Sequence, residues 1–232
     1  MLEVKDLSVF YDNVQVLWGI SLSVPEKSIV ALVGANGAGK TTLLNSICGV
    51  ARQREGSITL NGQRIDALPT KKIIPLGITL VPEGRHLFPE MSVHENLLMG
   101  GYVQPESLDG RIEEALEMFP ELRGKLRSKA ATLSGGQQQM LTVARSLLSQ
   151  PKVMLFDEPS QGLSPLYQQK IFELISRLPS LGISALVVEQ YVDRVLDVAD
   201  TAFVLRHGRV ALHGSASDVA AAPELRSAYL GL

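Results

Sequence analysis

One eight-residue segment constrains this chain more than any other. Gly34-Ala-Asn-Gly-Ala-Gly39-Lys40-Thr41 matches the phosphate-loop pattern, GxxxxGK[ST], at every fixed position. An apolar run from Ser28 to Val33 precedes the segment and an apolar helical pattern follows it, which is the strand–loop–helix context that such a loop requires. The alternative is a glycine-rich turn without a ligand. A chance match in a chain of 232 residues has odds of about one in a hundred.

The residue types of this segment suit the binding of a nucleoside triphosphate. Glycines allow backbone N–H groups to turn inward around phosphates, and the N-terminus of the following helix adds a partial positive charge. Lys40 is expected to reach the β- and γ-phosphates, and the hydroxyl of Thr41 is expected to ligate Mg²⁺. We expect the nucleotide to contact these loop residues: Gly34, Asn36, Gly37, Gly39, Lys40, Thr41 and Thr42.

A second motif supplies carboxylates. The apolar run from Val153 to Phe156 ends in Asp157 and Glu158. An acid at the carboxyl end of a strand, beside a phosphate loop, is well placed to hold Mg²⁺, and we assign that role to Asp157. Glu158 then points toward the γ-phosphate and can accept a proton from the attacking water. A solvated turn is the alternative, and the phosphate loop in the same chain favours the catalytic interpretation.

The third motif is the segment Leu133-Ser134-Gly135-Gly136-Gln137, directly before a helical pattern. A helix N-terminus with small residues is another anion site, and Ser134 is also expected to serve as its N-cap. One ligand rarely needs two such helix termini. We therefore expect the second one to serve a nucleotide that another subunit holds.

Hydrophobic patterns predict an α/β protein with a β-rich first third. Broken alternation predicts strands at residues 2–9, 20–24 and 57–60, the last entering an Asn61-Gly62 turn. Helical spacing predicts helices at 111–119, with Ile112, Leu116 and Phe119 on one face, and at 137–148. Buried strands of a parallel sheet are predicted at 152–157, 183–189 and 201–205.

Composition limits the partners. The net charge is −2 and no window approaches the roughly 18 apolar residues of a membrane span, so we expect neither nucleic-acid binding nor a transmembrane segment. The single cysteine, Cys48, excludes a disulfide framework, favours a reducing intracellular setting and is expected in the core. Trp18 is expected to pack beneath the nucleotide-binding sheet.

The order of the three motifs, phosphate loop, LSGGQ and an apolar strand ending in Asp-Glu, resembles the ATP-binding subunit of ABC transporters over essentially the whole chain. The resemblance implies an α/β P-loop NTPase core with a mostly parallel sheet, an N-terminal antiparallel β subdomain and an inserted α-helical subdomain. Residues 1–232 would form one nucleotide-binding domain, with LSGGQ in the helical insertion at about residues 86–150.

The same resemblance implies ligands and partners. ATP and Mg²⁺ would be bound between two ATPase subunits arranged head to tail, the second being a different, paralogous chain or a second copy of this one. The phosphate loop of one subunit would be covered by Ser134, Gly135, Gly136 and Gln137 of the other. Tyr11 would stack on adenine, and the alternative for Tyr11 is a half-buried strand tyrosine. Transmembrane permease subunits would carry the solute, a periplasmic or extracellular substrate-binding protein would deliver it, and this chain would lie peripherally at the cytoplasmic face of the cell membrane.

Three positions depart from the common pattern of that family. Glu83 stands where most members have glutamine, Gln190 where a histidine usually follows threonine, and Ser164 where many have aspartate. Glu83 offers a carboxylate oxygen to Mg²⁺ or water. Gln190 can donate a neutral hydrogen bond to the γ-phosphate but cannot carry a proton, so Glu158 must perform the acid–base work. The cross-dimer contact at Ser164 is left open.

The combination of VPEGR, EPS-x-GL and VVEQ is similar to one subgroup, the smaller, LivF-type ATPase of bacterial high-affinity branched-chain amino-acid importers, and Ala228-Tyr-Leu-Gly231 fits it too. Arg85, His86 and Phe88 then either touch a coupling helix of the membrane subunit or form an exposed loop. Two other functions remain open. The first is the ATPase of a urea or short-amide importer, although such a protein commonly keeps glutamine at the Glu83 position. The second is a soluble ABC ATPase, although such a protein usually has two ATPase domains or a long coiled coil.

Overall fold

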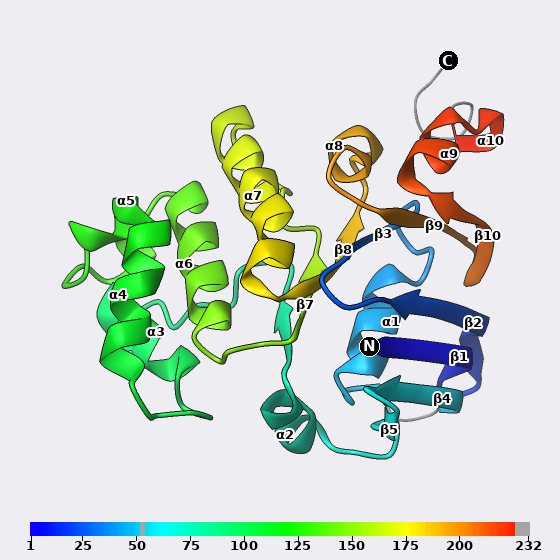
Figure 1. Ribbon diagram of the computed structural model, residues 1–232, viewed down its shortest axis with the longest axis horizontal. Helices are drawn as coiled ribbons and strands as arrows, with labels where there is room; N and C mark the ends of the chain where they lie inside the picture. Colours follow the sequence, from blue (N-terminus) through cyan, green and yellow to red (C-terminus); the bar gives the residue numbers. More distant parts are fainter. Residues whose placement is uncertain (52–53, 226–232) are drawn as a thin grey trace.

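The computed structural model describes residues 1–51 and 54–225, which form two sheets with helices around them (Figure 1). The segment Ala228 to Gly231 lies outside these residues. The strands are β1 (Leu2–Tyr11), β2 (Val14–Val24), β3 (Ile29–Val33), β4 (Arg54–Leu60), β5 (Gln63–Arg64), β6 (Ile78–Val81), β7 (Val153–Asp157), β8 (Ser184–Glu189), β9 (Thr201–Arg206) and β10 (Arg209–Ser215). The α-helices are α1 (Lys40–Ile47), α2 (Thr70–Ile73), α3 (Val93–Gly100), α4 (Leu108–Met118), α5 (Pro120–Arg123), α6 (Gly135–Leu147), α7 (Pro165–Arg177), α8 (Val192–Leu196), α9 (Ala216–Ala221) and α10 (Pro223–Leu225). Short 3₁₀ helices are η1 (Ile74–Leu76), η2 (Ala130–Thr132) and η3 (Leu178–Leu181).

The larger sheet has the strand order β10-β9-β3-β8-β7-β6. Within this sheet, adjacent strands from β9 to β6 pair in parallel, and only β10 pairs antiparallel, with β9. Strands inside a parallel sheet are covered on both faces, which explains why β3, β7 and β8 are short, continuous apolar runs, all buried. The predicted α/β fold with a mostly parallel sheet is therefore confirmed.

The smaller sheet is antiparallel, with the order β2-β1-β4-β5. Its last hairpin turns at Asn61 and Gly62, which both have positive φ angles, 50° and 79°. A two-residue hairpin turn of this kind requires φ > 0 at both positions, and Asn-Gly is the preferred pair. The turn predicted from these two residues is confirmed, as is the β-rich first third.

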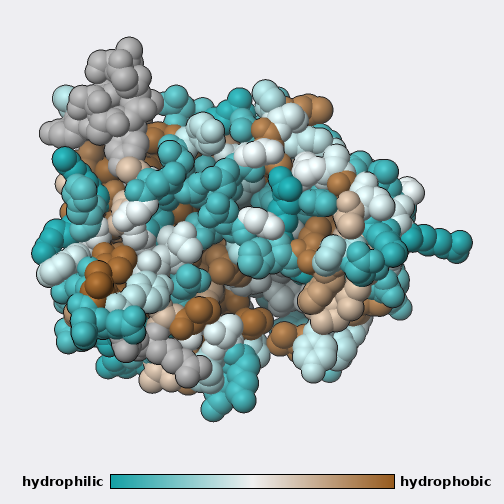
Figure 2. Space-filling model, turned by 180° about the vertical axis from the view of Figure 1, so that it is seen from behind, coloured by the Kyte–Doolittle hydropathy of each residue, from teal (hydrophilic) through white to brown (hydrophobic). Residues whose placement is uncertain are grey.

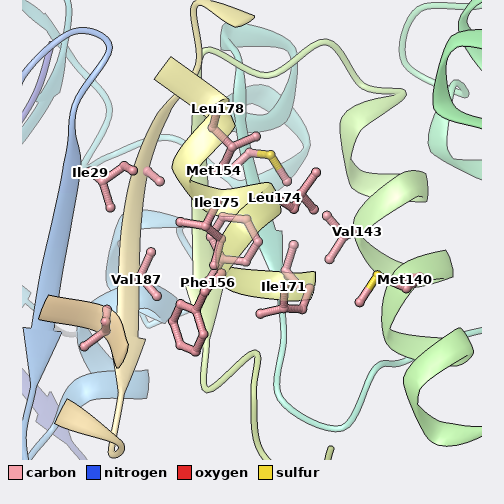
Figure 3. Close-up of a cluster of buried hydrophobic side chains, with 14 of the residues drawn as sticks. Ile29, Met140, Val143, Met154, Phe156, Ile171, Leu174, Ile175, Leu178 and Val187 are labelled. Carbon is pink, nitrogen blue, oxygen red and sulfur yellow. The ribbon is translucent and has the colours of Figure 1, made fainter. Parts of the chain in front are cut away.

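Two hydrophobic cores cover the two faces of the larger sheet. On one face Val187 of β8 and Phe156 of β7 pack against helix α7, where Ile171 and Ile175 contribute, and against α6 (Figure 3). On the other face Leu155 and its neighbours pack against α1 and the smaller sheet. Helix α1 therefore lies between the two sheets (Figure 1), and this buries the helix that follows the phosphate loop.

Helices α3 to α6 lie together beside the larger sheet (Figure 1). Ile112, Leu116 and Phe119 are buried, as the helical spacing of that segment predicts. These helices fall in the range, about residues 86–150, where the sequence predicts an inserted helical subdomain. The boundaries of that subdomain stay a prediction.

Two single residues test the expectations about the core. Cys48 is in the core as expected, and burial raises the pKa of its thiol to about 12. The expectation for Trp18 is wrong, because its side chain is 41% exposed and the Arg209 guanidinium lies 4.9 Å from its ring centroid. Trp18 follows the buried Leu17 on β2, and successive side chains of a strand point to opposite faces.

None of the helices in the described residues combines the length and apolar character needed to cross a lipid bilayer.

Candidate active site

Three groups of predicted site residues converge at one edge of the larger sheet. Val33, the last residue of β3, pairs with Glu189, and Asp157, the last residue of β7, pairs with Val188. Because these strands are parallel, their carboxyl ends meet, and the loops that follow them lie next to one another. The phosphate loop, the Asp157-Glu158 pair and Gln190 are therefore brought to the same edge by β3, β7 and β8.

The loop from Gly34 to Gly39 has a backbone that only glycine fits easily. Gly37 and Gly39 have φ angles of 77° and 106°. A Cβ atom at Gly34 would lie 2.6 Å from the carbonyl oxygen of Leu205, so this glycine is required for close packing against β9. Helix α1 begins at Lys40 without a side-chain cap and without an acidic residue in its first turn. Its first N–H groups are thus available to an anion.

Lys40 is 5% exposed and its ammonium is surrounded by oxygen atoms. Its Nζ donates to the carbonyl oxygen of Gly34 at 2.8 Å and of Ala35 at 3.3 Å, and lies 3.1 Å from Oε1 of Glu158. Both partners of this ion pair are buried, since the Glu158 side chain is 9% exposed. A phosphate that binds in the loop must compete with the Glu158 carboxylate for Lys40.

Thr41 and Asp157 form the second polar pair of the site. The hydroxyl of Thr41 donates to Oδ1 of Asp157 at 3.2 Å. Burial raises the pKa of Asp157, the carboxylates of Glu158 and Glu83 raise it further, and Thr41 and Lys40 oppose the shift. A divalent cation would relieve this crowding of negative charge, and a hydroxyl with a carboxylate oxygen is a donor set that Mg²⁺ prefers. Within the described residues, no cluster of three acidic, histidine or cysteine side chains could hold a metal by itself.

A cavity beside the loop is lined by half of the predicted site residues. Its lining consists of Val16, Asn36, Gly37, Gly39, Lys40, Thr41, Thr42, Glu83, Glu158 and Gln161. Gly34 and Asp157, which lie within two positions of a lining residue along the chain, are not part of it. Tyr11 and Gln190 also lie outside it. Tyr11 ends β1 and is 46% exposed, and Gln190 is exposed directly after β8.

The segment Ser134 to Gln137 also lies outside the cavity, at the start of α6. Ser134 Oγ accepts the N–H of Gln137 at 3.3 Å, and Gln137 Oε1 accepts the N–H of Ser134 at 3.1 Å. This reciprocal pair is a capping box, which confirms the predicted N-cap role of Ser134. The start of α6 does not line the cavity of its own chain, and the role of this helix end toward another subunit stays a prediction. Ser164, whose cross-dimer contact the sequence left open, is exposed at the start of α7.

Gly136 leads to a testable prediction, because a Cβ atom there would lie 2.2 Å from Cγ of the Tyr167 ring on α7. Gly136→Ala is expected to lower the free energy of unfolding by about 1–3 kcal/mol, the cost of overpacking a close contact. Chemical denaturation measures it. Gly110→Ala is the matched control, since a Cβ atom at Gly110 of α4 meets nothing within 4 Å. Equal stability of the two variants would contradict the tight Gly136–Tyr167 contact.

Two residues of this region received no role from the sequence. Gln161 lines the cavity next to Glu158, and Glu189 is a fully buried carboxylate at the end of β8. Both belong to motif segments, but a role for either depends on contacts between distant strands. The only signal in the sequence was an acid, Glu189, at the end of a strand predicted to be buried.

Comparison with known proteins gives a consistent result. The family model described as "ABC transporter" matches residues 17–161. The chain is 41% identical over 232 residues, all of both chains, to the high-affinity branched-chain amino acid transport ATP-binding protein BraG of Pseudomonas aeruginosa. It is 40% identical, over 94% of each chain, to a probable branched-chain amino acid transport ATP-binding protein LivF of Archaeoglobus fulgidus.

Solved structures show the same fold. A nucleotide-free ATP-binding cassette from an ABC transporter superposes with a TM-score of 0.87 and 26% identity, covering 97% of this chain and 96% of that one. An ABC transporter cassette in its ADP conformation also gives a TM-score of 0.87, with 27% identity and coverage of 100% and 99%.

Proposed function

This chain belongs to the ABC transporter family, and we propose that it is the ATP-hydrolysing subunit of an importer for branched-chain amino acids. The observation that carries the proposal is the cavity in which Lys40, Thr41 and Glu158 face the same space at the edge of the sheet. The full-length similarity to two ATP-binding proteins named for branched-chain amino-acid transport supports the substrate class.

In the proposed mechanism the loop N–H groups and Lys40 bind the phosphates of ATP. The ammonium of Lys40 leaves Glu158 as it turns to the phosphates, because both anions compete for it. Thr41 and Asp157, with Glu83 at the cavity wall, would hold Mg²⁺, which neutralises charge on the phosphates when bound. Tyr11, exposed at the end of β1, is available to stack on adenine.

Release of Glu158 from Lys40 provides a base for hydrolysis. Its freed carboxylate can accept a proton from the water that attacks the γ-phosphate. Gln190 supports this step as a neutral donor that orients the γ-phosphate or the water, because an amide donates hydrogen bonds without carrying a proton. Binding of ATP and activation of the base are thereby coupled through one ion pair.

A second ATPase subunit completes the site in this proposal. The N-terminal end of α6, a 13-residue helix, carries a partial positive charge and can approach phosphates of the partner's nucleotide. This end consists of the N-cap Ser134 and of Gly135, Gly136 and Gln137. We propose that residues from about 86 to about 150 form the helical subdomain that presents this end. A head-to-tail arrangement places two nucleotides between the chains. The partner in the cell is proposed to be a paralogous ATPase, and a second copy of this chain takes its place when the purified chain is studied alone.

A groove next to the helical part is the proposed contact with the permease subunits. It is lined by Leu80, His86, Phe88, Met99, Tyr102 and Val103 among others, and Tyr102 is 80% exposed. Figure 2 shows a face on which hydrophilic and hydrophobic side chains are interspersed and hydrophobic residues border a hollow. An exposed apolar groove of this kind is typical of a protein interface. The chain would then lie peripherally at the cytoplasmic face of the membrane, and a substrate-binding protein would act through the permeases.

Uptake of labelled leucine tests the proposed substrate class. Deletion of the gene is expected to reduce uptake at low external leucine to the background of other carriers, because the permeases lose their energy source. Wild-type protein should restore uptake, and a Glu158→Gln variant expressed at the same level should not. Labelled urea is the matched control solute. Leucine uptake that survives the deletion would contradict the proposal, and a selective loss of urea uptake would favour the urea importer.

A further inference from the structure

Glu189 is a buried carboxylate that the proposed mechanism does not use. It ends β8, between the strands that carry the phosphate loop and the Asp157-Glu158 pair, and its side chain is fully buried. Burial raises its pKa, as does the charge of Glu158, whereas hydrogen bonds from Ser160 and Gln190 oppose the shift. A buried carboxylate is costly unless it is hydrogen-bonded, so its contacts indicate what it contributes.

The two carboxylate oxygens of Glu189 bind two different segments of the site. Oε1 accepts the backbone N–H of Ser160 at 3.0 Å, and Oε2 accepts the backbone N–H of Gln190 at 3.2 Å. Ser160 is itself fully buried, and among the described residues its N–H group has no second acceptor. One side chain therefore connects the turn that follows Glu158 with the residue that follows β8.

The turn at Glu158 needs such a connection. Glu158 has a φ angle of 45°, in the left-handed region that a non-glycine residue adopts only when its surroundings hold it there. On its N-terminal side its own N–H donates to the carbonyl oxygen of Val188 at 2.9 Å, and its carbonyl accepts the N–H of Gln161 at 3.1 Å. The bond from Ser160 to Glu189 fixes the chain two residues further on.

We propose that Glu189 is a positioning residue for ATP hydrolysis, whose carboxylate holds the Glu158 turn and the Gln190 backbone in one fixed arrangement. The inference rests on the proposed roles of Glu158 and Gln190. Glu189 does not line the cavity, so it acts through these neighbours and does not contact the nucleotide. Its loss should therefore slow the hydrolysis step while leaving ATP binding in place.

Glu189→Gln tests this separation in the full-length protein. The amide keeps one acceptor oxygen but places an NH₂ group against one of the two backbone N–H groups, so one of the two hydrogen bonds is lost. We expect kcat to fall roughly 10- to 100-fold, as small misplacements of catalytic groups do, while the Kd for ATP stays within about twofold. Glu189→Asp keeps both acceptors on a side chain one methylene shorter, and its kcat should lie between those of the wild type and Glu189→Gln. Glu117→Gln, the same chemical change at an exposed position of α4, is the matched control and should leave both quantities unchanged.

Hydrogen exchange gives a readout that does not depend on catalysis. In nucleotide-free Glu189→Gln protein the backbone amide that faces the new NH₂ group, that of Ser160 or that of Gln190, should exchange faster than in the wild type, with no change in Glu117→Gln. A wild-type chain that hydrolyses no ATP would overturn the proposed function. Faster amide exchange in Glu189→Gln would still support the hydrogen bonds that Glu189 makes to the backbone. If Glu189→Gln does not fold, the Glu189→Asp variant carries the same measurements. The inference is overturned by unchanged amide exchange, by a kcat within about twofold of the wild type, or by a loss of ATP affinity equal to the loss of kcat.

Discussion

Replacing Glu158 with glutamine is expected to reduce ATP hydrolysis by roughly 10²- to 10⁴-fold, the contribution typical of a general base. Glutamine has nearly the same shape but cannot accept a proton from water at neutral pH. ATP should bind at least as tightly as in the wild type. The reason is that Lys40, which lies 3.1 Å from the Glu158 carboxylate, then meets a neutral amide and is free for the phosphates.

The same variant tests the two-chain site. With hydrolysis blocked, MgATP should remain between the phosphate loop of one chain and α6 of another, so a dimer should accumulate. Single-turnover phosphate release measures the rate, equilibrium titration measures ATP affinity, and light scattering measures the mass. Glu173→Gln, an exposed change on α7, is the control and should behave as the wild type. A Glu158→Gln protein that stays monomeric at saturating MgATP would contradict the head-to-tail arrangement, and one that hydrolyses ATP at the wild-type rate would contradict the base assignment.

The elements that position this site could be predicted from the sequence because they are fully buried. The runs that became β7 and β8 contain almost no polar residue before their last positions, and such short apolar runs are typical of strands covered on both faces of a parallel sheet. Trp18 shows where the same reasoning fails. A large aromatic residue was expected inside, but the alternation along β2 turns it outward, where Arg209 from β10 covers the ring.

The contacts inside the site could not be predicted from the sequence, for a different reason. Motif matching identified Lys40 and Glu158 separately, but their ion pair depends on how the phosphate loop folds against a strand more than a hundred residues later. The hydrogen bond between Ser160 and Glu189 likewise joins residues separated by 29 positions. Local patterns predict which segments form strands and loops, whereas such pairings follow from sheet order.

The ion pair makes Lys40→Ala the variant with the largest expected effect on binding. Hydrogen bonds to charged groups contribute about 1.5–3 kcal/mol each. If Lys40 makes one such bond to each of the β- and γ-phosphates, its removal should weaken ATP binding by roughly 100-fold or more. Removal of one partner from a buried ion pair also leaves the other charge uncompensated, so Glu158 should destabilise the folded state by about 3–5 kcal/mol. Calorimetric titration with ATP and chemical denaturation measure the two effects.

A double variant separates these two effects. In Lys40→Ala/Glu158→Gln the uncompensated carboxylate is gone, so stability should largely recover, whereas ATP binding should stay weak because the phosphates still lack their cation. Lys72→Ala, at an exposed position of α2, controls for the loss of a lysine and should change neither quantity. Tight ATP binding by Lys40→Ala would contradict the phosphate role of Lys40. Recovery of binding together with stability in the double variant would mean that Lys40 acts only by neutralising Glu158. The outcome thus decides whether Lys40 binds the phosphates of the nucleotide or only neutralises the carboxylate of Glu158.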